Sequence, residues 1–413
     1  MPTPALPALS LRVADGGRRG ASAGAVLRAV LEDGPIARST IARVTGLSPA
    51  SVTGHCTELT ELGLLRELPE QVRANGAGRP HMPVDIDVTR HLAAAVHIAV
   101  RMTTTALLDL RGRVIARRRI PHASTEPEAI VEHAARSIAE LYAEYGGGAR
   151  LLGVGVATGG WVDPESGVVM DHPRLGWSLV PLRELLGART GLPVSVDGHS
   201  RALLHAEVLF GEASRVGSVL HVFVGNVVDA AFATRGEAHY GSRAQAGAIA
   251  HFPVEGSREP CACGRIGCLE AAVSEHTLTR RAHEQGIVQD PDIRALFEAA
   301  RDGNEAAVEL FVDRSRLVGR AVALLMDAFG PERAVVTDPT LPYLPRALEA
   351  LRGATRENVR TDCDVDSVLT TTSFPGRVLE IAGGAVLLDA LYRNPLGTIN
   401  SEDLNVDTAV RFR

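Results

Sequence analysis

The sequence predicts an α/β protein in which a small helical module precedes a larger domain of alternating strands and helices. The prediction rests on three observations. Residues 21–68 show the apolar spacing of short helices, whereas from about residue 81 onward strand-like runs alternate with helix-like runs. At 413 residues the chain is also too long for one ordinary core. Alternation of this kind implies sheets covered by helices, and the length implies two or three domains.

Composition and charge are typical of a soluble globular protein, with 45% hydrophobic residues, 22% charged residues and a formal net charge of −6. This charge provides no overall basic field, so any contact with nucleic acid must come from a local patch. No run approaches the ~18 uninterrupted apolar residues of a membrane span, and the first residues lack a basic segment followed by an apolar one. We therefore expect a cytoplasmic protein without membrane contact, whose residues 1–20, rich in Pro and Ala, form a disordered lead.

Two short helices are predicted at the start of the helical module. The first covers residues 23–34 and stops at Gly34, which is followed by proline. The second covers residues 37–46 and uses Gly46 as its C-terminal stop. Their inward-facing residues are expected to be Val26, Leu27, Val30 and Leu31 in the first helix and Ile41 and Val44 in the second.

A third helix is predicted over residues 48–63. Ser48 is a good N-cap, Pro49 suits the first helical position, and Gly63 ends the helix. The buried stripe of this helix is expected to consist of Val52, Cys56 and Leu59.

The segment after the third helix resembles a wing. Residues 64–68 have the character of a first wing strand, and residues 70–80 are Gly-rich and polar, as in a wing tip or linker. Three helices, a short turn containing glycine between the second and third, and a wing fit a winged helix-turn-helix, which reads DNA. The alternative is a small helical packing module.

The exposed side of the third helix contains no Arg, Asn or Gln, the residues that make bidentate contacts with base edges. Direct readout should therefore be modest, and affinity should depend on arginines that contact phosphates. Arg79, stiffened by the proline after it, is suited to a narrow minor groove. Arg18 and Arg19 either add a flexible phosphate contact or belong to a solvated tail. The candidate DNA-binding residues are Arg38, Arg43, Ser48, Pro49, Ser51, Thr53, His55, Arg73 and Arg79.

The larger domain begins with three strands of a meander and continues as strands and helices in alternation. Its C-terminal part, from residue 275 to 355, is mostly helical, and a closing helix precedes a loose tail. The predicted elements are strands at 91–100, 104–110 and 112–120, a helix at 126–146, a buried strand and Gly-rich turn at 151–163, a strand, turn and helix at 194–210, a hairpin at 217–236 and the closing helix at 376–392.

Three of the five cysteines lie within eight residues, and in a reducing compartment such clustering favours a metal over a disulfide. Gly264 and Gly267 let the backbone fold around an ion, and a histidine on the preceding strand can supply the fourth ligand. The alternative is a coincidental cluster of buried cysteines. A closed shell of three thiolates and one imidazole predicts structural Zn²⁺ rather than hydrolysis, with Cys56 in the core and Cys363 in no site. The predicted ligands are His251, Cys261, Cys263 and Cys268.

The run around these cysteines resembles the zinc motif of the ROK family, which comprises repressors, open reading frames and sugar kinases. The resemblance spans about residues 80–395 and is carried by AGAIAHFPVE…CACGRIGCLEA, GVGVATGGWVDPESGVV, LGWSLVPLRELLGARTGLPVSVDGHSRALLHAE and IAGGAVLLDALY. It implies two actin-like lobes, as in sugar kinases, with the sugar and nucleotide sites in the cleft between them. In this family a winged helix in front marks the regulators and its absence marks the kinases.

With this resemblance the domain organisation can be stated. The expected units are a lead at 1–20, a winged helix-turn-helix at 21–70, a wing or linker at 71–80, a first lobe at 81–200 completed by the helix at 376–394, a second lobe with the zinc site at 201–375, and a tail at 395–413.

The family's kinase motifs are degraded in this sequence. The first phosphate loop of the kinases, Asp-x-Gly-Gly-Thr, corresponds to residues 97–101, which contain no glycine, so the backbone cannot approach phosphate closely. The second loop corresponds to residues 225–229, where Asp229 would repel phosphate, and the catalytic Asn-Asp pair corresponds to Gly198 and His199. Three losses in one chain predict that the protein is not an enzyme.

The sugar site is altered as well. The family's Gly-Glu-x-Gly-His motif corresponds to residues 247–251, where the Glu is missing, and Arg174 replaces a family Asn. These changes predict a more basic cleft, which is either an orphan scaffold, the interpretation we favour, or a site for an anionic or non-sugar ligand. The candidate ligand-binding residues are Arg174, His199, His251 and Glu270.

The resemblance and the residues together predict a DNA-binding transcriptional regulator, and we favour a repressor over an activator. Its expected partners are a double-stranded operator, a second copy of itself in a homodimer or dimer of dimers, and a small-molecule effector that is a sugar or an anionic metabolite. One alternative is a ROK-type regulator that receives its signal from a protein partner or a non-sugar anion. The other is a sugar kinase with an N-terminal helical module.

Overall fold

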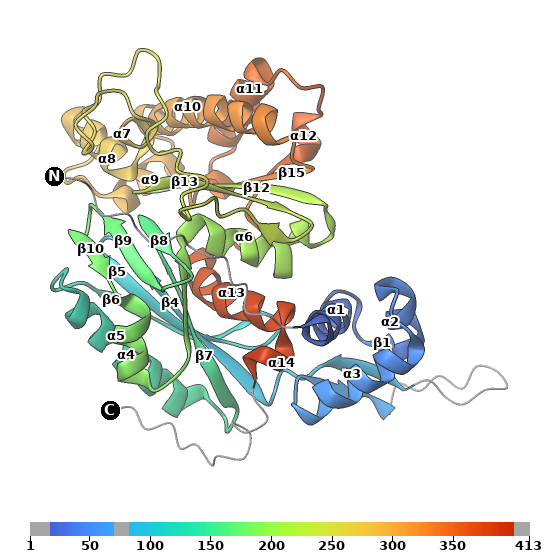
Figure 1. Ribbon diagram of the computed structural model, residues 1–413. Coiled ribbons are helices and arrows are strands. Elements are labelled where there is room, and N and C mark those ends of the chain that lie inside the picture. The colour runs from blue at the N-terminus through green and yellow to red at the C-terminus, as the bar shows by residue number, and fades with distance from the viewer. Residues whose placement is uncertain (1–16, 70–81, 400–413) are drawn as a thin grey trace, which may run out of the picture.

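The computed structural model describes residues 17–69 and 82–399, which form a small head and two larger lobes (Figure 1). Each lobe contains a five-stranded sheet covered by helices, and the head contains three helices and a three-stranded sheet. This arrangement confirms the predicted α/β class.

The head is a winged helix. Its helices α1 to α3 precede a small sheet whose strands run in the order β1-β3-β2, with β3 antiparallel to both neighbours. The buried side chains of the third helix are the predicted ones, with His55 added. The elements are α1 (Arg18–Asp33), β1 (Ile36–Ala37), α2 (Arg38–Thr45), α3 (Pro49–Glu61), β2 (Leu65–Glu67) and β3 (Pro83–Ile86).

Three expectations for the head are wrong. Helix α1 begins at Arg18, so the predicted disordered lead extends into a helix. Strand β3 belongs to the wing sheet, although residue 81 was expected to begin the first lobe, because a strand of four residues carries no signal of which sheet it joins. The side chain of Val44 is 49% exposed instead of facing inward. The wing tip at 70–81 lies outside the described residues.

The first lobe is built on a mixed sheet. Its strands, in spatial order, are β11 (Val194–Gly198), β7 (Arg150–Thr158), β4 (His91–Ile98), β5 (Met102–Leu108) and β6 (Val114–Pro121). The three meander strands were predicted and pair antiparallel, whereas β7 and β11 are parallel to their neighbours. On one face lie α4 (Pro127–Tyr145) and α5 (Leu182–Thr190), with a small hairpin sheet of β8 (Trp161–Asp163), β9 (Val168–His172) and β10 (Trp177–Val180) nearby.

The closing helix α13 (Val378–Arg393) crosses the other face of this sheet at very close range. A Cβ atom on Gly383 would lie 2.7 Å from the carbonyl oxygen of Val96 in β4, and one on Gly155 of β7 would lie 2.0 Å from the carbonyl oxygen of Gly383. Glycine at these positions therefore lets backbone pack directly on backbone.

The second lobe has its own five-stranded sheet, in the order β14 (Glu237–Ala238), β13 (Val228–Thr234), β12 (Ser218–Val224), β15 (Arg333–Thr337) and β16 (Leu369–Thr371). Helix α6 (His199–Phe210) lies between the lobes, packing on α13 and on β12 and β13 (Figure 1). The lobe is completed by η2 (Glu212–Arg215), α7 (Leu269–Val273), α8 (Glu275–Glu284), α9 (Ile293–Arg301), α10 (Glu305–Phe329), η3 (Leu341–Tyr343), α11 (Pro345–Asn358) and α12 (Val365–Val368).

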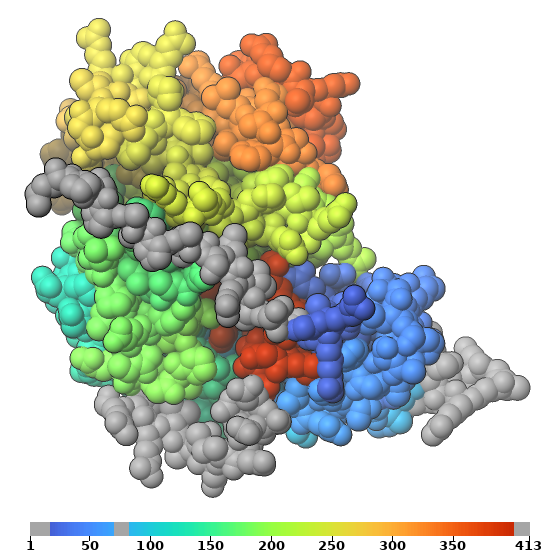
Figure 2. All heavy atoms as spheres, in the orientation of Figure 1, coloured from blue at the N-terminus to red at the C-terminus, as the bar shows by residue number. Residues whose placement is uncertain are grey.

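The head is fused to the first lobe rather than tethered to it. One apolar core contains side chains of the head together with Leu387, Leu391 and Tyr392 of α13. A short helix, α14 (Pro395–Thr398), and the buried Ile399 join the same core, so the tail expected from residue 395 begins as packed structure. Figure 2 shows the N-terminal head and the C-terminal helices in contact on one face of the molecule.

Within the described ranges, no helix combines the length and the apolar character needed to cross a membrane.

Candidate DNA-reading head, metal cluster and interlobe cleft

The turn between α2 and α3 is built by local sequence signals. Gly46 ends α2 in the left-handed conformation, with φ +70°. The Ser48 side chain then accepts a hydrogen bond from the backbone N–H of Ser51 at 3.1 Å, and Pro49 occupies the first turn of α3. These features fix the angle at which α3 leaves the turn, as the sequence predicts.

The exposed face of α3 carries small polar side chains. Ser48, Pro49, Ser51 and Thr53 are all exposed. The Thr53 hydroxyl donates to the carbonyl oxygen of Pro49 at 2.9 Å, so its proton is used within the helix and its oxygen remains available as an acceptor.

His55, one of the candidate DNA-binding residues, does not lie on this exposed face. His55 is only 9% exposed, and its Nδ1 lies 3.9 Å from Glu58 Oε2. Thr57, which the sequence analysis did not name, is exposed one turn after Thr53 and extends the face. The helical periodicity could have predicted that Thr57 is exposed, because Thr57 is four residues from Thr53 and lies on the same face of α3.

The arginines around α3 differ in their availability. Arg43 is exposed and forms no ion pair with another described residue, whereas Arg38 is bound to Glu67 of β2 at 2.5 Å. Arg19 bridges α1 to Glu58 of α3 at 2.9 Å and so is not part of a tail. A half-exposed arginine of β2 that sequence reasoning missed, Arg66, lies on the wing strand. Arg73 and Arg79 lie outside the described residues.

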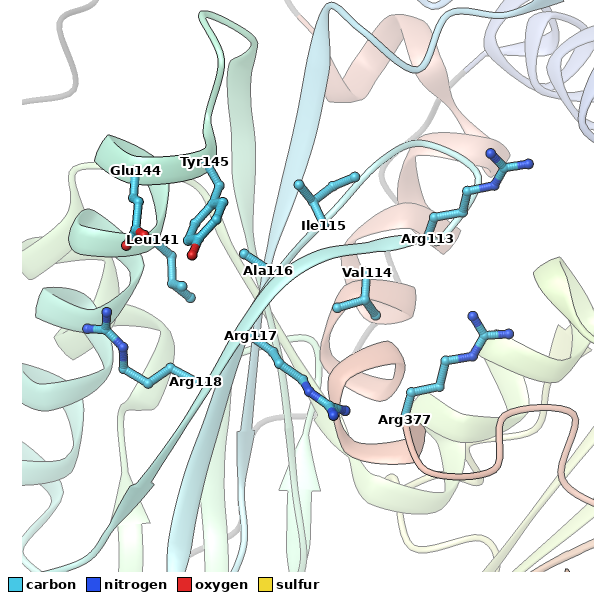
Figure 3. A pocket seen from close by; sticks show the side chains of 10 residues that line it. All are labelled: Arg113, Val114, Ile115, Ala116, Arg117, Arg118, Leu141, Glu144, Tyr145 and Arg377. Atoms are coloured by element: carbon cyan, nitrogen blue, oxygen red, sulfur yellow. The ribbon is translucent and has the colours of Figure 1, made fainter.

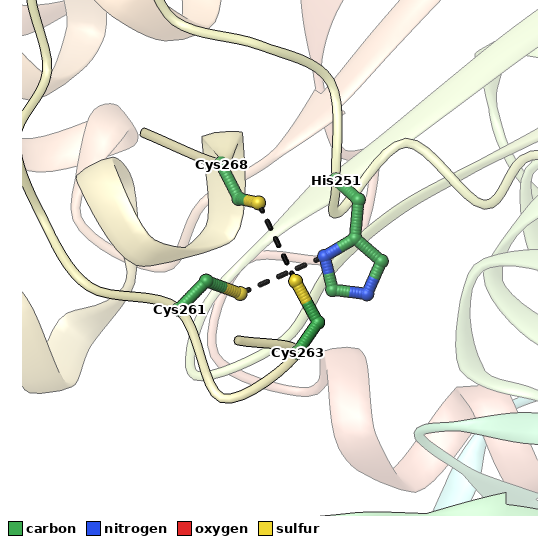
Figure 4. Close-up of side chains that lie close together, drawn as sticks. All are labelled: His251, Cys261, Cys263 and Cys268. Atoms are coloured by element: carbon green, nitrogen blue, oxygen red, sulfur yellow. Dashed lines mark hydrogen bonds between the residues drawn. The ribbon is translucent and has the colours of Figure 1, made fainter. Parts of the chain in front are cut away.

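The four predicted metal ligands converge on one point (Figure 4). Their ligand atoms lie within 4.8 Å of one another, with 3.7 Å between the Sγ atoms of Cys263 and Cys268 and 3.6 Å between Cys261 Sγ and His251 Nδ1. Zn–S and Zn–N bonds of about 2.3 and 2.0 Å at tetrahedral angles separate ligand atoms by roughly 3.5–3.8 Å. The donor set therefore fits a zinc-sized ion.

Positive φ angles shape the loop that holds these sulfur atoms. Gly264 and Gly267 have φ values of +84° and +76°, which glycine adopts without strain. Cys268 is buried as the residue before α7, whereas Cys263 is exposed, so the cluster is not an ordinary apolar core. His251 lies in a turn and not on a strand as predicted, because the chain leaves β14 well before it.

A cavity of about 430 Å³ opens beside this cluster, and we call it the metal-side cavity. Of the predicted ligand-binding residues, Arg174, His251 and Glu270 line it together. Arg174 Nη2 lies 3.6 Å from Glu270 Oε1, so the positive charge that replaces the family Asn is already compensated.

Acidic side chains accompany the arginines of this cavity. The cavity is also lined by Asp171 and Asp229, and the Ser200 hydroxyl donates a hydrogen bond to Asp229. Burial raises the pKa of Asp229 to about 6, because the charged carboxylate loses water there. Carboxylates therefore outnumber the arginines that face this cavity.

His199 lies in a second cavity, of about 550 Å³, which we call the histidine cavity. Its Nδ1 is 2.6 Å from Nε2 of His97, the residue that begins the former first phosphate loop. Burial lowers the pKa of His97 to about 4 and that of His199 well below the ordinary value, so both rings are neutral at pH 7.

Four acidic residues and three arginines line the histidine cavity: Glu275, Asp292, Asp338 and Glu380, and Arg101, Arg119 and Arg294. Asp229, which was expected to repel phosphate here, lines the metal-side cavity instead, because its side chain points to the other side of β13. The charges of the histidine cavity are partly compensated, because Glu380 pairs with Arg119 and Asp338 pairs with Arg314.

The largest of these hollows, about 720 Å³, is a shallow groove at the outer edge of the first lobe (Figure 3). Arginines of β6 and the end of α4 line it. Arg118 pairs with Glu140 and Arg117 with Glu380, so the charges of this groove are partly compensated. We assign it no ligand.

Comparison with known proteins shows the family to which the chain belongs. The sequence profile described as the ROK family matches residues 93–374. The chain belongs to the ROK family. A Mycobacterium tuberculosis protein named as a transcriptional regulator is 34% identical over 393 residues, which cover 92% of this chain and 87% of that protein. The Escherichia coli DNA-binding transcriptional dual regulator NagC is 29% identical over 324 residues, covering 76% of this chain and 79% of NagC.

Solved structures agree with this assignment at the level of the fold. The crystal structure of a ROK family transcriptional regulator, a homologue of the E. coli MLC protein, matches with a TM-score of 0.77 and 23% identity, covering 91% of this chain and 97% of that one. A ROK glucokinase from Streptomyces griseus matches with a TM-score of 0.62 and 22% identity over 71% of this chain and 98% of its own. Because it has a winged-helix head and its relatives are named transcriptional regulators, this ROK protein is a transcriptional regulator.

Proposed function

We propose that this ROK protein binds double-stranded operator DNA through the exposed face of α3 and represses transcription in the cytoplasm. The observation that carries the proposal is the capped turn from α2 to α3, which presents Ser51 and Thr53 to solvent beside the exposed Arg43. Small side chains at the centre and cations at the edge suit a head that depends on phosphate contacts and groove shape.

The proposed role of the two lobes is to receive a signal without phosphoryl transfer. Zn²⁺ held by His251 and the three cysteines would cross-link the loop that borders the metal-side cavity, supplying structural stability and no reactive position. We propose that this cavity receives the effector. Because its lining carries more carboxylates than arginines, an uncharged polar molecule such as a sugar fits better than the anion considered from sequence. A protein of Escherichia coli O6:H1 that is 29% identical to this chain is named N-acetylglucosamine repressor, which is compatible with that class.

We further propose that the protein works as a homodimer or a dimer of dimers, built through the second lobe. One short recognition helix reads few bases, so a symmetric pair reading an inverted repeat supplies the missing specificity. Light scattering at micromolar concentration should give at least twice the chain mass, and a monomer would contradict this part of the proposal.

The DNA-binding proposal is tested by selecting binding sites from a random DNA pool with the full-length protein. We expect enrichment of an inverted repeat that the wild type binds in gel shifts. Thr53→Glu should abolish this binding, because it places a negative charge against phosphates. Ala306→Glu adds the same charge at an exposed position of α10 and should leave binding unchanged. Failure to enrich any sequence, or binding by Thr53→Glu at wild-type affinity, would overturn the proposal.

A further inference from the structure

A buried charged arginine, Arg201 of α6, forms part of the wall of the metal-side cavity. Its Nε lies 2.7 Å from Asp197 Oδ1, and its two terminal nitrogens donate to the carbonyl oxygens of Val162 and Ala244 at 3.1 Å each. The guanidinium therefore joins three segments that frame the cavity. Arg201 is only 7% exposed, so a ligand that moves the loop around Ala244 must also displace this group.

One turn further along α6, His205 lies between two buried carboxylates. Its Nε2 is 3.7 Å from Asp197 Oδ2, and its Nδ1 is 3.4 Å from Asp389 Oδ1 on α13. The Tyr240 hydroxyl donates to Asp197 at 3.4 Å. The two carboxylates raise the pKa of His205 to about 9, so the imidazole is a cation at neutral pH.

Asp389 continues the series to the head. Its Oδ2 accepts from Arg393 Nε at 2.5 Å, and its Oδ1 lies 3.4 Å from Nη2 of Arg28 on α1. The backbone is close at the same place, because a Cβ on Gly24 of α1 would lie 2.4 Å from the carbonyl oxygen of Arg393. A shift of this end of α13 must therefore move α1.

Five buried or half-buried groups thus alternate in sign from the cavity to the head: Arg201, Asp197, His205, Asp389 and Arg28. We call them the Arg201–Arg28 chain. Asp197 lies on β11, and the other four residues lie on α6, α13 and α1, which follow one another across the centre of the molecule (Figure 1). Removing one buried charge leaves its neighbours uncompensated, so such a series responds as a unit.

We propose that the Arg201–Arg28 chain transmits occupancy of the metal-side cavity to helix α1, with Arg201 as the residue that senses the ligand. The inference rests on the proposed function, in which this cavity receives the effector and the head binds DNA. Displacing Arg201 breaks its bond to Asp197 and leaves that carboxylate to draw His205 away from Asp389 Oδ1, the oxygen that also holds Arg28, so the charge balance at α1 changes. Both lobes take part, because Tyr240 belongs to the second lobe and Asp197 to the first.

The first test is a double-variant cycle on a DNA fragment selected by the wild-type protein. Arg201→Met and Arg28→Met should each change the dissociation constant by about 3- to 10-fold, within the range for residues along a coupled network. In the Arg201→Met background, the further effect of Arg28→Met should fall below about twofold. If the effects of Arg201→Met and Arg28→Met on the dissociation constant multiply as independent changes, the Arg201–Arg28 chain does not couple the cavity to the head.

Arg215→Met is the matched control. Arg215 of η2 also binds the head, at 2.7 Å from Asp33, but it does not touch the cavity or the chain. The effects of Arg215→Met and Arg201→Met on the dissociation constant should multiply, as expected for independent changes. Tyr240→Phe, which removes a single hydroxyl, is the gentler variant if Arg201→Met unfolds, and it should also reduce the effect of Arg28→Met.

A second measurement separates this inference from the proposed function, because it needs no DNA. Hydrogen exchange of the full-length protein should show amides of α1 exchanging at least about threefold faster in Arg201→Met than in the wild type. Exchange in α4, on the opposite face of the first-lobe sheet, should be unchanged. Unaltered exchange in α1 would overturn the inference, whereas failure of the DNA selection with faster exchange in α1 would overturn only the proposed function.

Discussion

At the scale of single residues, the metal cluster brings together three sulfur atoms that favour a bound cation. Three thiolates within 4.8 Å of one another repel unless a cation binds among them. We therefore predict one zinc per chain in the purified protein and a loss of most of it in Cys263→Ser, measured by elemental analysis. Cys363 lies outside the cluster, so Cys363→Ser should keep the wild-type zinc content. A zinc-free wild type, or full retention in Cys263→Ser, would contradict the assignment.

The charge of His205 gives a pH dependence of stability whose sign can be worked out. Its folded pKa of about 9 lies above the ordinary 6.5, so the stabilisation is complete below pH 6.5 and is lost as the pH rises toward 9. The loss should be on the order of 3 kcal/mol, because raising a pKa by one pH unit corresponds to about 1.4 kcal/mol. Urea unfolding of the wild type at pH 6.5 and 9 should show this loss, and His205→Gln should lack most of it.

The control for this prediction is His221→Gln. His221 is equally buried, in the second lobe, where its Nε2 contacts Thr337 Oγ1 at 2.9 Å. Burial lowers its pKa to about 3, so its contribution changes only below pH 6.5 and the variant should keep the wild-type slope from 6.5 to 9. Equal slopes for the wild type and His205→Gln would show that His205 is neutral in the fold.

At the scale of an element, α3 and its flanks should read DNA mainly through charge. Arg43→Ala should weaken selected and random DNA about equally, and the slope of log affinity against log salt should become shallower by about 0.9. Thr53→Ala should cost only on the order of 1 kcal/mol, because water can replace one hydroxyl contact. Salt titrations on both DNAs check this. If Thr53→Ala lost its preference for the operator while Arg43→Ala kept the wild-type affinity, helix α3 would recognise the base sequence by direct contact.

Helix α13 depends on glycine where it crosses β4. Gly383→Ala should lower the free energy of unfolding by about 1–3 kcal/mol, because the new methyl group would overlap the backbone of Val96. Gly353 of α11 has open space around its Cα, so Gly353→Ala should raise stability by up to about 1 kcal/mol through helix propensity. Chemical denaturation of both variants measures the difference, and an unaffected Gly383→Ala would contradict the close packing.

At the scale of the whole molecule, two lobes enclose a cleft whose phosphate-loop residues differ from the motifs of the family's kinases. The loop at 97–101 has no glycine, a neutral His97–His199 pair occupies its start, and carboxylates face the histidine cavity. We predict no ATP-dependent phosphorylation of glucose, mannose or N-acetylglucosamine in a coupled assay that a ROK glucokinase passes under the same conditions. Turnover clearly above the blank would show that the cleft still positions a nucleotide.

Features that depend on a few neighbouring residues could be predicted from the sequence. The Ser48 cap, the Gly46 stop, the meander strands and the spacing of the three cysteines are local, because each is set by backbone preferences or by ligands within one short loop. The resemblance to the ROK family added the two lobes, and the comparisons confirm that family.

Which distant groups meet depends on how the chain packs in three dimensions. Residues 28 and 389, far apart in the chain, form an ion pair, His199 meets His97 instead of joining Arg174, and β3 completes the wing. The charge balance of the cleft is decided in the same way, since the partner of Arg174 and the cavity that Asp229 lines depend on how the sheets pack. A side chain's charge is written in the sequence, but the groups that compensate it are fixed only when the lobes and the head come together.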